Sequence, residues 1–564
     1  MKKETTNSGI SRRTFLKTAG TGAAIGILGI AAAGCGSTRP SSSPSSDSAP
    51  AAVKHTWEIV PKPIADNQIS SKVDAAVVIV GAGIAGMSAF LAANEAGSQA
   101  VIIEKTPTIN ARGLDNGAVD SKLQKAAGIK IDKGALINDL MQAAGYKANG
   151  RLLKLWADKS GEVFDYIIDL VEKNGGACAI GDAGHGSVKT DGFWQRTYPT
   201  DHVFGKEVHK CQQDLVKLME AKGIESGGKS YYNNTAVQLV KDSTGKMIGV
   251  IAKDKDGKYI KYNASKAVIL ATGDYGANKE MVDAWCPIAN EVENSVYTKA
   301  GINTGDGINM AMWAGGSIQK YSHAPMIHPI FGGGALSTAS FLRVDRDGNR
   351  FCNEDTPLPG ITNSVMIAPN KLVWTIFDSN YEAQLPGMSE LSIYNYNTSG
   401  PLYFAPADGR VKFTDPPSAS VKVSLEDGTT VTGNTIEELA AAMNMPADNL
   451  KATIARYNEL VERGKDEDFG KDNRNLCPIK TGPFFASKVP AKLLVIVGGL
   501  NVDYRLRVLD KDDKPIDGLY AIGNTSGNFF GNDYPLVAPG LSHGRCLTFG
   551  RLLGQAVAKD KYIQ

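Results

Sequence analysis

The stretch VDAAVVIVGAGIAGMSAFLAANEAGSQAVIIEK, residues 73–105, decides the fold. It begins with a β-branched apolar run, 75–80, which has the length of a buried parallel strand. A glycine-rich turn, an Ala- and Leu-rich segment with helical spacing and a second apolar strand, 100–103, follow in that order. The stretch therefore predicts a βαβ unit at the start of an α/β domain.

The glycines of this unit are spaced for a nucleotide phosphate. Gly81, Gly83 and Gly86 fit the pattern G-x-G-x-x-G. In that pattern the first glycine permits a tight turn, the second lets the backbone approach a pyrophosphate and the third allows close helix packing. Glu104, which ends the second strand, can accept hydrogen bonds from a ribose diol. We therefore expect dinucleotide binding; the competing interpretation is an ordinary βαβ unit with a glycine-rich turn.

Length, charge and cysteine content limit the classes of protein to which the chain could belong. A chain of 564 residues is too long for one core and should form two folded domains with appendages. The net charge of +2, from 61 basic and 59 acidic residues, gives no case for nucleic acid, which needs a concentrated basic face. The seven cysteines include no C-x-x-C pair, which argues against iron–sulfur, structural zinc and covalent haem, so we predict no metal site.

The first 35 residues are typical of an export signal. Ser-Arg-Arg-Thr-Phe-Leu-Lys, residues 11–17, precedes an apolar Gly/Ala-rich segment and resembles the twin-arginine signal. Cys35 follows Ala-Ala-Gly as in a lipoprotein cleavage site, and residues 36–71 begin with a Ser/Pro/Ala-rich tether. We expect twin-arginine export and a lipid anchor on the outer face of the cytoplasmic membrane. The alternatives are a Sec signal with two chance arginines and simple cleavage near Cys35.

Later segments continue the α/β pattern. Residues 151–174 have amphipathic spacing for one helix or two, and 206–223 predict another helix that ends before a glycine. Residues 235–263 alternate between turn signals and predict an antiparallel meander. The run Ala-Val-Ile-Leu-Ala-Thr-Gly-Asp, 267–274, predicts a short buried strand that ends close to a ligand.

This order of segments resembles the flavoproteins of the fumarate reductase/succinate dehydrogenase family. The chain has the nucleotide unit, a hairpin insertion, VILATG, and then Gly-Asp-Gly at 305–307 on a helix start. Gly-Leu-Tyr-Ala-Ile-Gly-Asn, 518–524, and Thr-Phe-Gly-Arg, 548–551, resemble that family's second flavin-contacting segment. The resemblance covers about residues 73–564 and implies one non-covalent FAD per chain.

The family also implies a Rossmann-like FAD-binding domain interrupted by an α+β capping domain. We place the FAD-binding domain at 72–321 and 489–564 and the capping domain at 322–488. The cofactor-binding residues that we expect are Gly81, Ala82, Gly83, Ala85, Gly86, Glu104, Lys105, Ala271, Thr272, Gly273, Asp306, Gly523, Asn524, Gly540 and Leu541.

The C-terminal segment predicts a helix aimed at the flavin. Gly540 and Gly544 precede a helix that should begin near Arg545. The partial positive charge of a helix N-terminus would stabilise negative charge at the N1–C2=O edge of reduced flavin. The alternative is a glycine-rich loop that only closes the sheet.

The substrate positions depart from the fumarate reductase pattern. His328-Pro329 matches the family's His-Pro, whose histidine helps to hold substrate, and residues 350–354 match its R-F-x-N-E. However, Leu358 stands where the family's proton-donating arginine would lie, and apolar residues at 494–497 replace a polar segment that contains histidines. The later Asn-Arg-Leu-Gly-Gly is also absent from 531–536. A dicarboxylate is therefore a poor substrate for this site.

Tyr534-Pro535 resembles the corresponding segment of 3-ketosteroid dehydrogenases, where the tyrosine hydrogen-bonds a ketone oxygen. A phenol suits that role because it can donate to a developing enolate without adding a fixed charge. The alternative interpretation of Tyr534 is a side chain that only packs on the flavin or on the cap. The other catalytic candidates are Arg545, His328 and His543. For His323, Arg343 and Arg350, a structural role is as well supported as a role at the substrate.

Three functions follow as hypotheses. The first is an exported reductase that transfers hydride from flavin N5 to the activated C=C of a small conjugated organic substrate. It would take electrons from a separate flavin- or haem-bearing membrane partner, since the chain has no haem motif. The second is a dehydrogenase of the 3-ketosteroid type, and the third is a flavin-binding surface lipoprotein without catalysis.

Overall fold

The computed structural model describes residues 54–109, 111–180, 198–204, 211–294, 301–329, 332–356, 358–385, 388, 402–405, 410–413, 416–535 and 537–563. The predicted export signal and Cys35 lie outside these residues. The chain divides into two units, Met1–Val53 and Lys54–Gln564, and every element below belongs to the second. Within the described ranges no helix combines the length and apolarity that a membrane crossing needs.

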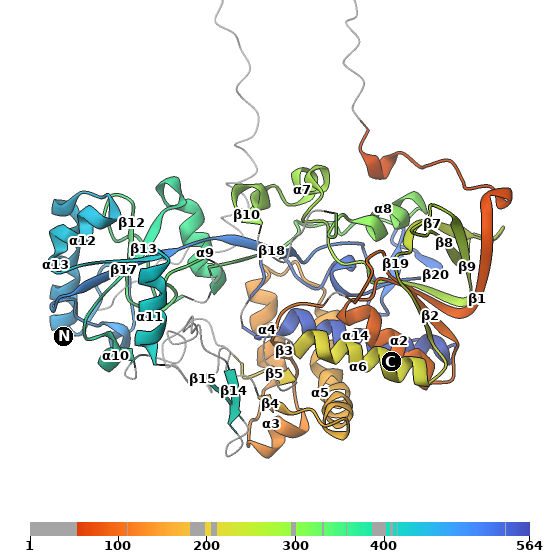
Figure 1. Cartoon of the computed structure of the whole chain (residues 1–564), viewed down its shortest axis with the longest axis horizontal. Helices are drawn as coiled ribbons and strands as arrows, with labels where there is room; N and C mark the ends of the chain where they lie inside the picture. Colours follow the sequence, from red (N-terminus) through yellow and green to blue (C-terminus); the bar gives the residue numbers. More distant parts are fainter. Residues whose placement is uncertain are drawn as a thin grey trace, which may run out of the picture. The chain divides into compact units, whose positions relative to one another are not determined.

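The nucleotide unit lies at the centre of a mixed sheet of eight strands (Figure 1). Its main path runs β19-β20-β9-β1-β2-β6, and β1 pairs in parallel with both β2 and β9. Val77 to Val80 are almost fully buried, as the apolar run predicts. The strands of this path are β1 (Ile69–Val80), β2 (Ala100–Ile103), β6 (Lys229–Tyr231), β9 (Tyr259–Leu270), β19 (Arg507–Leu509) and β20 (Pro515–Ala521).

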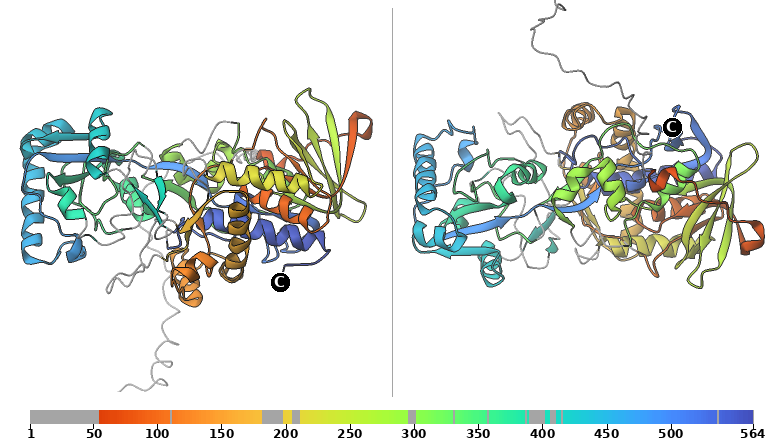
Figure 2. Two further views of the ribbon diagram at one scale, coloured as in Figure 1. Left: turned by 60° about the horizontal axis from the view of Figure 1, so that its bottom comes forward. Right: turned by 90° about the horizontal axis from the view of Figure 1, so that it is seen from above.

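Three helices lie side by side along one face of this sheet: α2 (Ile84–Glu95), α6 (Cys211–Glu225) and α14 (Leu541–Ala558) (Figures 1 and 2). Glycines bring α14 close to α2. A Cβ at Gly550 would lie 2.5 Å from the Ala85 carbonyl oxygen, and one at Gly554 would lie 2.4 Å from that of Ala89. This close packing fixes the start of α14 near the carboxyl ends of the parallel strands.

The meander is confirmed, with one difference. It consists of β7 (Thr235–Lys241), β8 (Met247–Lys253) and β9, paired antiparallel. We expected the meander to lead into a separate short strand at 267–274. Instead β9 is a single strand of 12 residues, because its first half pairs with β8 and its second half pairs with β20.

The predicted helices form with different ends. Residues 151–174 form the single helix α5 (Gly150–Lys173), whose amphipathic side chains pack on α14. The described part of the next helix, α6, continues past Gly223 to Glu225. Gly223 packs closely against Phe90, and a Cβ there would lie 2.5 Å from the ring, so the contact requires glycine.

The α+β cap is confirmed as a second centre of packing. Its antiparallel sheet has the order β12-β13-β17-β16, with helices α11 (Pro417–Glu426), α12 (Ile436–Met443) and α13 (Ala447–Arg463). Most buried apolar residues of β12, α12 and α13 form a cluster with part of β13 and β17 that is separate from the core of the FAD-binding sheet, whereas Val373 and Val489 belong to that core. The strands are β12 (Leu342–Asp345), β13 (Val373–Asp378), β16 (Thr430–Gly433) and β17 (Phe484–Val489).

A small three-stranded sheet lies where the chain passes between the two parts. It has the order β10-β18-β11 and consists of β10 (Glu293–Asn294), β18 (Lys492–Ile496) and β11 (Pro325–His328). Residues 494–497, predicted as a buried strand, form the end of β18 and the residue after it. The remaining elements are β3 (Asn116–Gly117), α3 (Lys122–Ala126), α4 (Lys133–Ala143), β4 (Cys178–Ile180), β5 (Asp201–Phe204), α7 (Lys279–Trp285), α8 (Asp306–Trp313), α9 (Leu358–Ile367), α10 (Tyr381–Gln384), β14 (Leu402–Ala405) and β15 (Arg410–Phe413).

The segment at 350–354, which matches the family's R-F-x-N-E, has a structural role in the cap. The guanidinium of Arg350 binds Glu354 at 2.8 Å and Asp466 at 2.7 Å inside the cap. Lys471 lies 3.3 Å from Glu354. Burial alone would raise the pKa of Glu354, but Lys471 and Arg350 outweigh it and hold that pKa below its usual value. Arg350 therefore holds the cap together, and so does Arg343, which is buried and donates to backbone carbonyls such as that of Glu354.

Candidate active site and cofactor cradle

The predicted glycine loop has the geometry of a phosphate-binding turn. Gly81 adopts a φ of +104°, and a Cβ there would lie 2.3 Å from the Ala271 carbonyl oxygen. A Cβ at Gly86 would lie 2.0 Å from the carbonyl oxygen of Gly81. Glycine is therefore required at both positions. The N-terminus of α2 follows Gly83 directly and offers N–H groups to an anion.

Acidic and basic side chains lie on one side of the glycine-rich turn. Glu104 accepts a 2.9 Å hydrogen bond from the backbone N–H of Ala82, which places its carboxylate at the nucleotide turn. Lys105 forms a 2.9 Å ion pair with Asp306 at the start of α8. The predicted residues Glu104, Lys105 and Asp306 therefore lie at the same edge of the sheet.

The ends of β9 and β20 form the neighbouring part of this edge. Thr272 and Thr525 hydroxyls lie 3.2 Å apart, and Thr525 donates to the carbonyl of Gly273 at 3.0 Å. Because β20, β9, β1 and β2 are all parallel, their carboxyl ends lie together. The expected cofactor residues Glu104, Lys105, Thr272, Gly273 and Asp306 consequently lie at one edge of the sheet.

The start of α14 corrects one prediction. We expected a helix near Arg545 after Gly540 and Gly544, but α14 begins at Leu541 with Gly540 as its N-cap at φ +73°. Gly544 lies inside the first turn, where a Cβ would lie 1.9 Å from the Gly117 carbonyl oxygen. The glycine serves close packing against β3, and it does not end a loop. Leu541 and Gly540 remain at the N-terminus of the helix, as the cofactor prediction requires.

Among the residues that the structure describes, Arg545 is a buried cation without a carboxylate partner. It is fully buried, and its Nη2 donates to the side-chain oxygen of Asn524 at 3.0 Å. Within the described residues, Nε and Nη1 have no acceptor. The guanidinium lies 4.7 Å from the ring centroid of Phe530, and burial lowers its pKa. Such a group requires an electron-rich ligand, because an uncompensated buried charge is costly.

Asn524 links this arginine to a buried acid. Asp274 accepts hydrogen bonds from the backbone N–H of Gly276 at 2.7 Å and from the Asn303 side chain at 3.0 Å. Burial raises the pKa of Asp274 to about 6, and the hydrogen bonds, including one to Asn524, oppose that shift. The chain Asp274–Asn524–Arg545 fixes the arginine at the end of β20.

Tyr534 and His328 meet although they come from different parts of the chain. Their ring centroids lie 6.1 Å apart, and Tyr534 also packs on Phe530 at 5.2 Å. The phenol oxygen of Tyr534 accepts a 3.2 Å hydrogen bond from the backbone N–H of Ser542 in the first turn of α14. Burial raises the pKa of Tyr534, and it lowers that of His328 to about 4, so the imidazole is neutral at pH 7. His328 Nε2 has no hydrogen-bond partner in the described part of the chain.

His543, the remaining catalytic candidate, is held by the backbone. Its Nδ1 donates to the carbonyl oxygen of Asp115 at 2.8 Å, and its ring fills the space beside Gly113, where a Cβ would lie 2.2 Å from the ring. Burial lowers its pKa. His323 is likewise buried, and its Nδ1 is hydrogen-bonded to the hydroxyl of Tyr275. Tyr534 and Arg545 thus both lie beside Phe530, and His328 lies beside Tyr534. His543 instead binds the backbone carbonyl of Asp115.

Two acids near this site, Asp115 and Asp201, were not predicted from the sequence. Burial raises the pKa of each acid, to about 6 for Asp115, and the charge of Asp115 further raises the pKa of Asp201. Neither lies in a known pattern, and Asp201 reaches the site only because β5 pairs with β3. The only available signal was the small, polar sequence around 110–119, which we assigned to a loop along the cofactor.

The residues at the carboxyl ends of β1, β2, β9 and β20 together with the start of α14, called the cradle below, fit FAD. Gly81 and Gly86 leave the space in which a Cβ would clash, and the helix start after Gly83 offers N–H donors to a pyrophosphate. Arg545 supplies two buried nitrogens without acceptors, and the hydroxyl of Thr548 on the same helix also has no partner among the described residues. These orphaned donors at the start of α14 are suited to the polar edge of an isoalloxazine.

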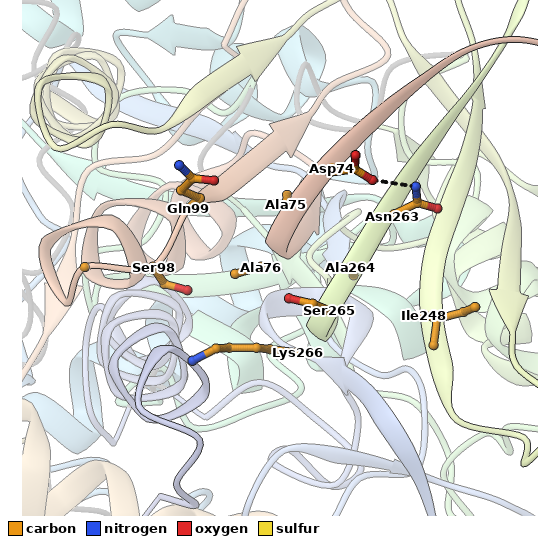
Figure 3. A pocket seen from close by; sticks show the side chains of 11 residues that line it. Asp74, Ala75, Ala76, Ser98, Gln99, Ile248, Asn263, Ala264, Ser265 and Lys266 are labelled. Carbon is orange, nitrogen blue, oxygen red and sulfur yellow. Dashed lines mark hydrogen bonds between the residues drawn. The ribbon is translucent and has the colours of Figure 1, made fainter.

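A separate hollow of about 630 Å³ opens elsewhere on the sheet (Figure 3). It lies beside Asp74, Ser98, Asn263 and Lys266, before the buried ends of β1 and β2. Ligands of such sheets bind at the carboxyl ends of the strands, so this hollow is distinct from the cradle.

Fold and cradle together define a flavoprotein with a cap next to its cofactor edge. The chain matches the model of the family described as "FAD binding domain" over residues 76–541 and belongs to that family. It is an FAD-dependent oxidoreductase of the class that acts on carbon–carbon bonds, as its relatives are. The fold and FAD as cofactor are thereby confirmed.

Three similar proteins indicate the range of the class. The chain is 26% identical to the vinyl phenol reductase of Lactiplantibacillus plantarum, with coverage of 86% of this chain and 97% of the relative. It is also 26% identical to a cytochrome fumarate reductase of Shewanella frigidimarina, with coverage of 86% and 77%. The solved 3-ketosteroid-Δ4-(5α)-dehydrogenase of Rhodococcus jostii has a TM-score of 0.65 at 22% identity, with coverage of 86% and 97%, and thus shares the fold.

Proposed function

We propose that the protein is an exported reductase that adds hydrogen across the C=C bond of a conjugated organic acceptor with less charge than fumarate. The acceptor would be an enone, an enoate or a vinyl-substituted aromatic compound. The observation that carries this proposal is the group formed by Tyr534, His328, Phe530 and Arg545. It combines a buried phenol, a neutral imidazole, an aromatic wall and one buried cation.

The proposed chemistry assigns a role to each side chain. FAD, when bound and reduced, supplies a hydride to one carbon of the double bond. Tyr534 donates the proton, either to the neighbouring carbon or to the oxygen of a conjugated carbonyl. The Ser542 N–H bond to Tyr534 stabilises the phenolate that this donation leaves. Arg545, fixed by Asn524, supplies positive charge where negative charge develops.

The same groups disfavour a dicarboxylate. Two carboxylates need two cationic clamps, and Arg545 is the cation that the described residues bring to Tyr534. His328 is neutral because burial lowers its pKa to about 4. Asp115 and Asp201 act electrostatically on Tyr534 and would repel an anion. Desolvating a dianion against this surface therefore costs more than binding a neutral aromatic molecule.

The similarity to vinyl phenol reductase supports an aromatic acceptor. The compound in that relative's name has a conjugated double bond on an aromatic ring, and the match covers 97% of the relative. An aromatic ring can pack against Phe530 and Tyr534, whose own centroids lie 5.2 Å apart.

Localisation and electron supply belong to the proposal as well. The twin-arginine pattern at 11–17 and the cleavage pattern at Cys35 support export and a lipid anchor on the outer face of the cytoplasmic membrane. A separate flavin- or haem-bearing membrane protein would then reduce the FAD. The ordered electron path would run from that partner through the FAD to the acceptor.

The alternative with structural support is the reverse reaction. Tyr534 could assist removal of hydrogen next to a ketone, as proposed from its resemblance to 3-ketosteroid dehydrogenases. The same buried phenol and Arg545 would stabilise the enolate in either direction. A flavin-binding lipoprotein without catalysis would bind the acceptors and show no turnover.

The test compares fumarate with its uncharged ester. The FAD-loaded protein is reduced anaerobically with a dye, and flavin absorbance is followed after adding fumarate, dimethyl fumarate, 4-vinylphenol or a cyclic enone. We expect rapid reoxidation by at least one uncharged acceptor and none by fumarate. Fastest reoxidation by fumarate would contradict the proposal. If no acceptor reacts but a saturated ketone reduces the oxidised enzyme, the dehydrogenase is correct.

A further inference from the structure

The carboxylate of Asp533 connects the cap to the candidate proton donor. Its Oδ2 accepts a 2.8 Å hydrogen bond from the side-chain amide of Asn363 on the cap helix α9. Its Oδ1 accepts the backbone N–H of Tyr534 at 2.8 Å. The Tyr534 oxygen in turn accepts the N–H of Ser542 at 3.2 Å, in the first turn of α14. A row of three hydrogen bonds therefore runs from the cap through Tyr534 to the helix at the cofactor edge.

Two of these hydrogen bonds favour the ionised form of Asp533. Burial raises the pKa of Asp533, and the bonds from the Asn363 side chain and the Tyr534 N–H oppose that shift. Hydrogen bonds to an ionised group are stronger than those between neutral groups. Asn363 is exposed, so water can replace its amide when the cap moves away. The bond therefore favours contact of the cap with Asp533 and can still break when substrate enters.

The backbone before this carboxylate is held without α9. A Cβ at Gly531 would lie 2.3 Å from the carbonyl oxygen of Ala144, at the end of α4, so the two segments pack closely. Asn532 Oδ1 accepts hydrogen bonds from Lys147 at 2.8 Å and from Ser322 at 2.9 Å. Residues 531 and 532 are thus fixed by contacts outside α9, and α9 acts on the next residue.

The same helix also holds the segment that carries His328. Thr362, the residue before Asn363, is 1% exposed, and its hydroxyl donates to the carbonyl oxygen of Ile327 at 3.0 Å. Ile327 directly precedes His328, whose ring lies 6.1 Å from that of Tyr534. Two consecutive residues of α9 therefore reach both sides of the candidate active site.

We propose that Asn363 and Asp533 are positioning residues that place Tyr534 for proton donation when the cap closes on the substrate. This inference rests on the proposed function. With the Asn363 bond formed, Tyr534 is held at its backbone by the cap and at its oxygen by α14. When the bond breaks, the phenol loses its connection to the cap and the site can exchange substrate and product.

This role fits the departure of the cap from the fumarate reductase pattern. The helix α9 begins at Leu358, where the chain lacks the arginine that donates the proton in that pattern. With the donor on the FAD-binding part, the cap contributes the placement of the donor and not the donor itself. Closure of the cap and proton donation are coupled in both arrangements.

The test exchanges the donor and the acceptor of the Asn363–Asp533 bond. In the FAD-loaded Asn363→Asp variant two carboxylates face each other, and the bond is lost. We expect wild-type FAD content and wild-type reduction of the flavin by a dye. Reoxidation by the fastest of dimethyl fumarate, 4-vinylphenol and the cyclic enone should slow by roughly 10- to 100-fold, because small misplacements of a catalytic group have effects of this size.

The double variant Asn363→Asp/Asp533→Asn should restore the reaction. Its new amide can donate to the new carboxylate, and the amide oxygen can still accept the Tyr534 N–H. We expect it to regain most of the wild-type rate. A double variant as slow as Asn363→Asp, or a wild-type rate in Asn363→Asp, would overturn the proposal.

Another pair between the cap and the FAD-binding part supplies the matched control. Lys371, which follows α9, forms a 2.6 Å ion pair with Glu291 that lies outside the row ending at Tyr534. Lys371→Gln should change neither reduction nor reoxidation of the flavin. Equal slowing in Lys371→Gln and Asn363→Asp would show that docking of the cap in general limits the reaction, and it would overturn the positioning role.

A second readout needs no turnover. The Tyr534 N–H exchanges slowly with solvent while it stays bound to Asp533. Hydrogen exchange of the peptide 528–534, measured by mass spectrometry, should be faster in FAD-loaded Asn363→Asp than in the wild type. It should return to the wild-type rate in the double variant and stay unchanged in Lys371→Gln. Equal exchange in all four proteins would refute the proposal.

Tyr534→Phe separates failure of this inference from failure of the proposed function. A fully active Tyr534→Phe enzyme refutes the role of Tyr534 as proton donor. A slow Tyr534→Phe enzyme together with a wild-type rate in Asn363→Asp refutes the positioning role alone. In the combined variant the two effects should not add, because both substitutions act on one proton transfer, and additive slowing would also refute the positioning role.

Discussion

The imidazole ring of His328 lies 6.1 Å from the phenol ring of Tyr534. His328 ends β11 at the beginning of the cap, and Tyr534 precedes α14 of the FAD-binding part. Asn363 of the cap and Asp533 are also hydrogen-bonded, at 2.8 Å. The candidate active site is therefore built from both parts of the chain, with the cap supplying a neutral imidazole beside the phenol.

Replacing Tyr534 with Phe should separate catalysis from cofactor binding. The ring and its packing on Phe530 remain, but the proton donor is lost. We expect unchanged FAD content and a kcat reduced by about 10²- to 10⁴-fold, the usual contribution of a general acid. Steady-state kinetics with the best acceptor, together with the flavin absorbance of the purified variant, will measure both. Wild-type turnover would remove the assignment.

Replacing Arg545 with Met should lower the reduction potential of the flavin. The arginine is buried and has no carboxylate partner in the described part of the chain, so its charge is available to stabilise reduced flavin. We expect a shift of roughly −30 mV or more, since about 30 mV corresponds to a tenfold change for a two-electron couple. Potentiometric titration checks this.

The same substitution should not destabilise the protein without cofactor, because a buried unpaired charge is removed. Arg545→Lys keeps the charge and serves as the control for the potential. An unchanged potential in Arg545→Met would mean that the guanidinium does not act on the flavin.

Two glycine substitutions test the phosphate turn. Gly81 and Gly97 both have positive φ, at 104° and 83°, so alanine strains the backbone at either position. A Cβ at Gly81 would lie 2.3 Å from a backbone oxygen, whereas nothing lies within 4 Å of one at Gly97. We expect Gly81→Ala to lose bound FAD and Gly97→Ala to retain it, with a cost of about 1 kcal/mol. Equal FAD content in both would refute the steric argument.

Buried neutral histidines should make the fold sensitive to acid. The pKa of His328 is lowered to about 4 by burial, so the unfolded chain binds a proton at a higher pH than the folded chain does. Stability is then full above about pH 6.5 and falls as the pH drops toward 4, by up to ~1.4 kcal/mol per pH unit for this group. Melting temperatures measured between pH 7 and pH 4.5 will test this. His328→Gln should lose less stability over that interval than the wild type, and parallel curves would contradict the expectation.

The sequence by itself determined the nucleotide cradle and the cofactor. Gly81, Gly86 and Glu104 lie in one βαβ unit, where short-range spacing dictates the turn, the helix packing and the position of the acid. The end of β9 and the segment after β20 could also be predicted, because parallel strands place their carboxyl ends at one edge. The departures from the fumarate reductase pattern were equally visible in the sequence.

Only the tertiary structure decided which side chains share the active site. Asp201 reaches Asp115 through the pairing of β5 with β3, and His328 reaches Tyr534 through the placement of the cap. The start of α14 at Leu541 depends on the close approach of Gly544 to Gly117, which no local pattern records. Contacts between distant segments arise from the packing of whole elements, whereas periodicity and spacing describe only the neighbourhood of each residue.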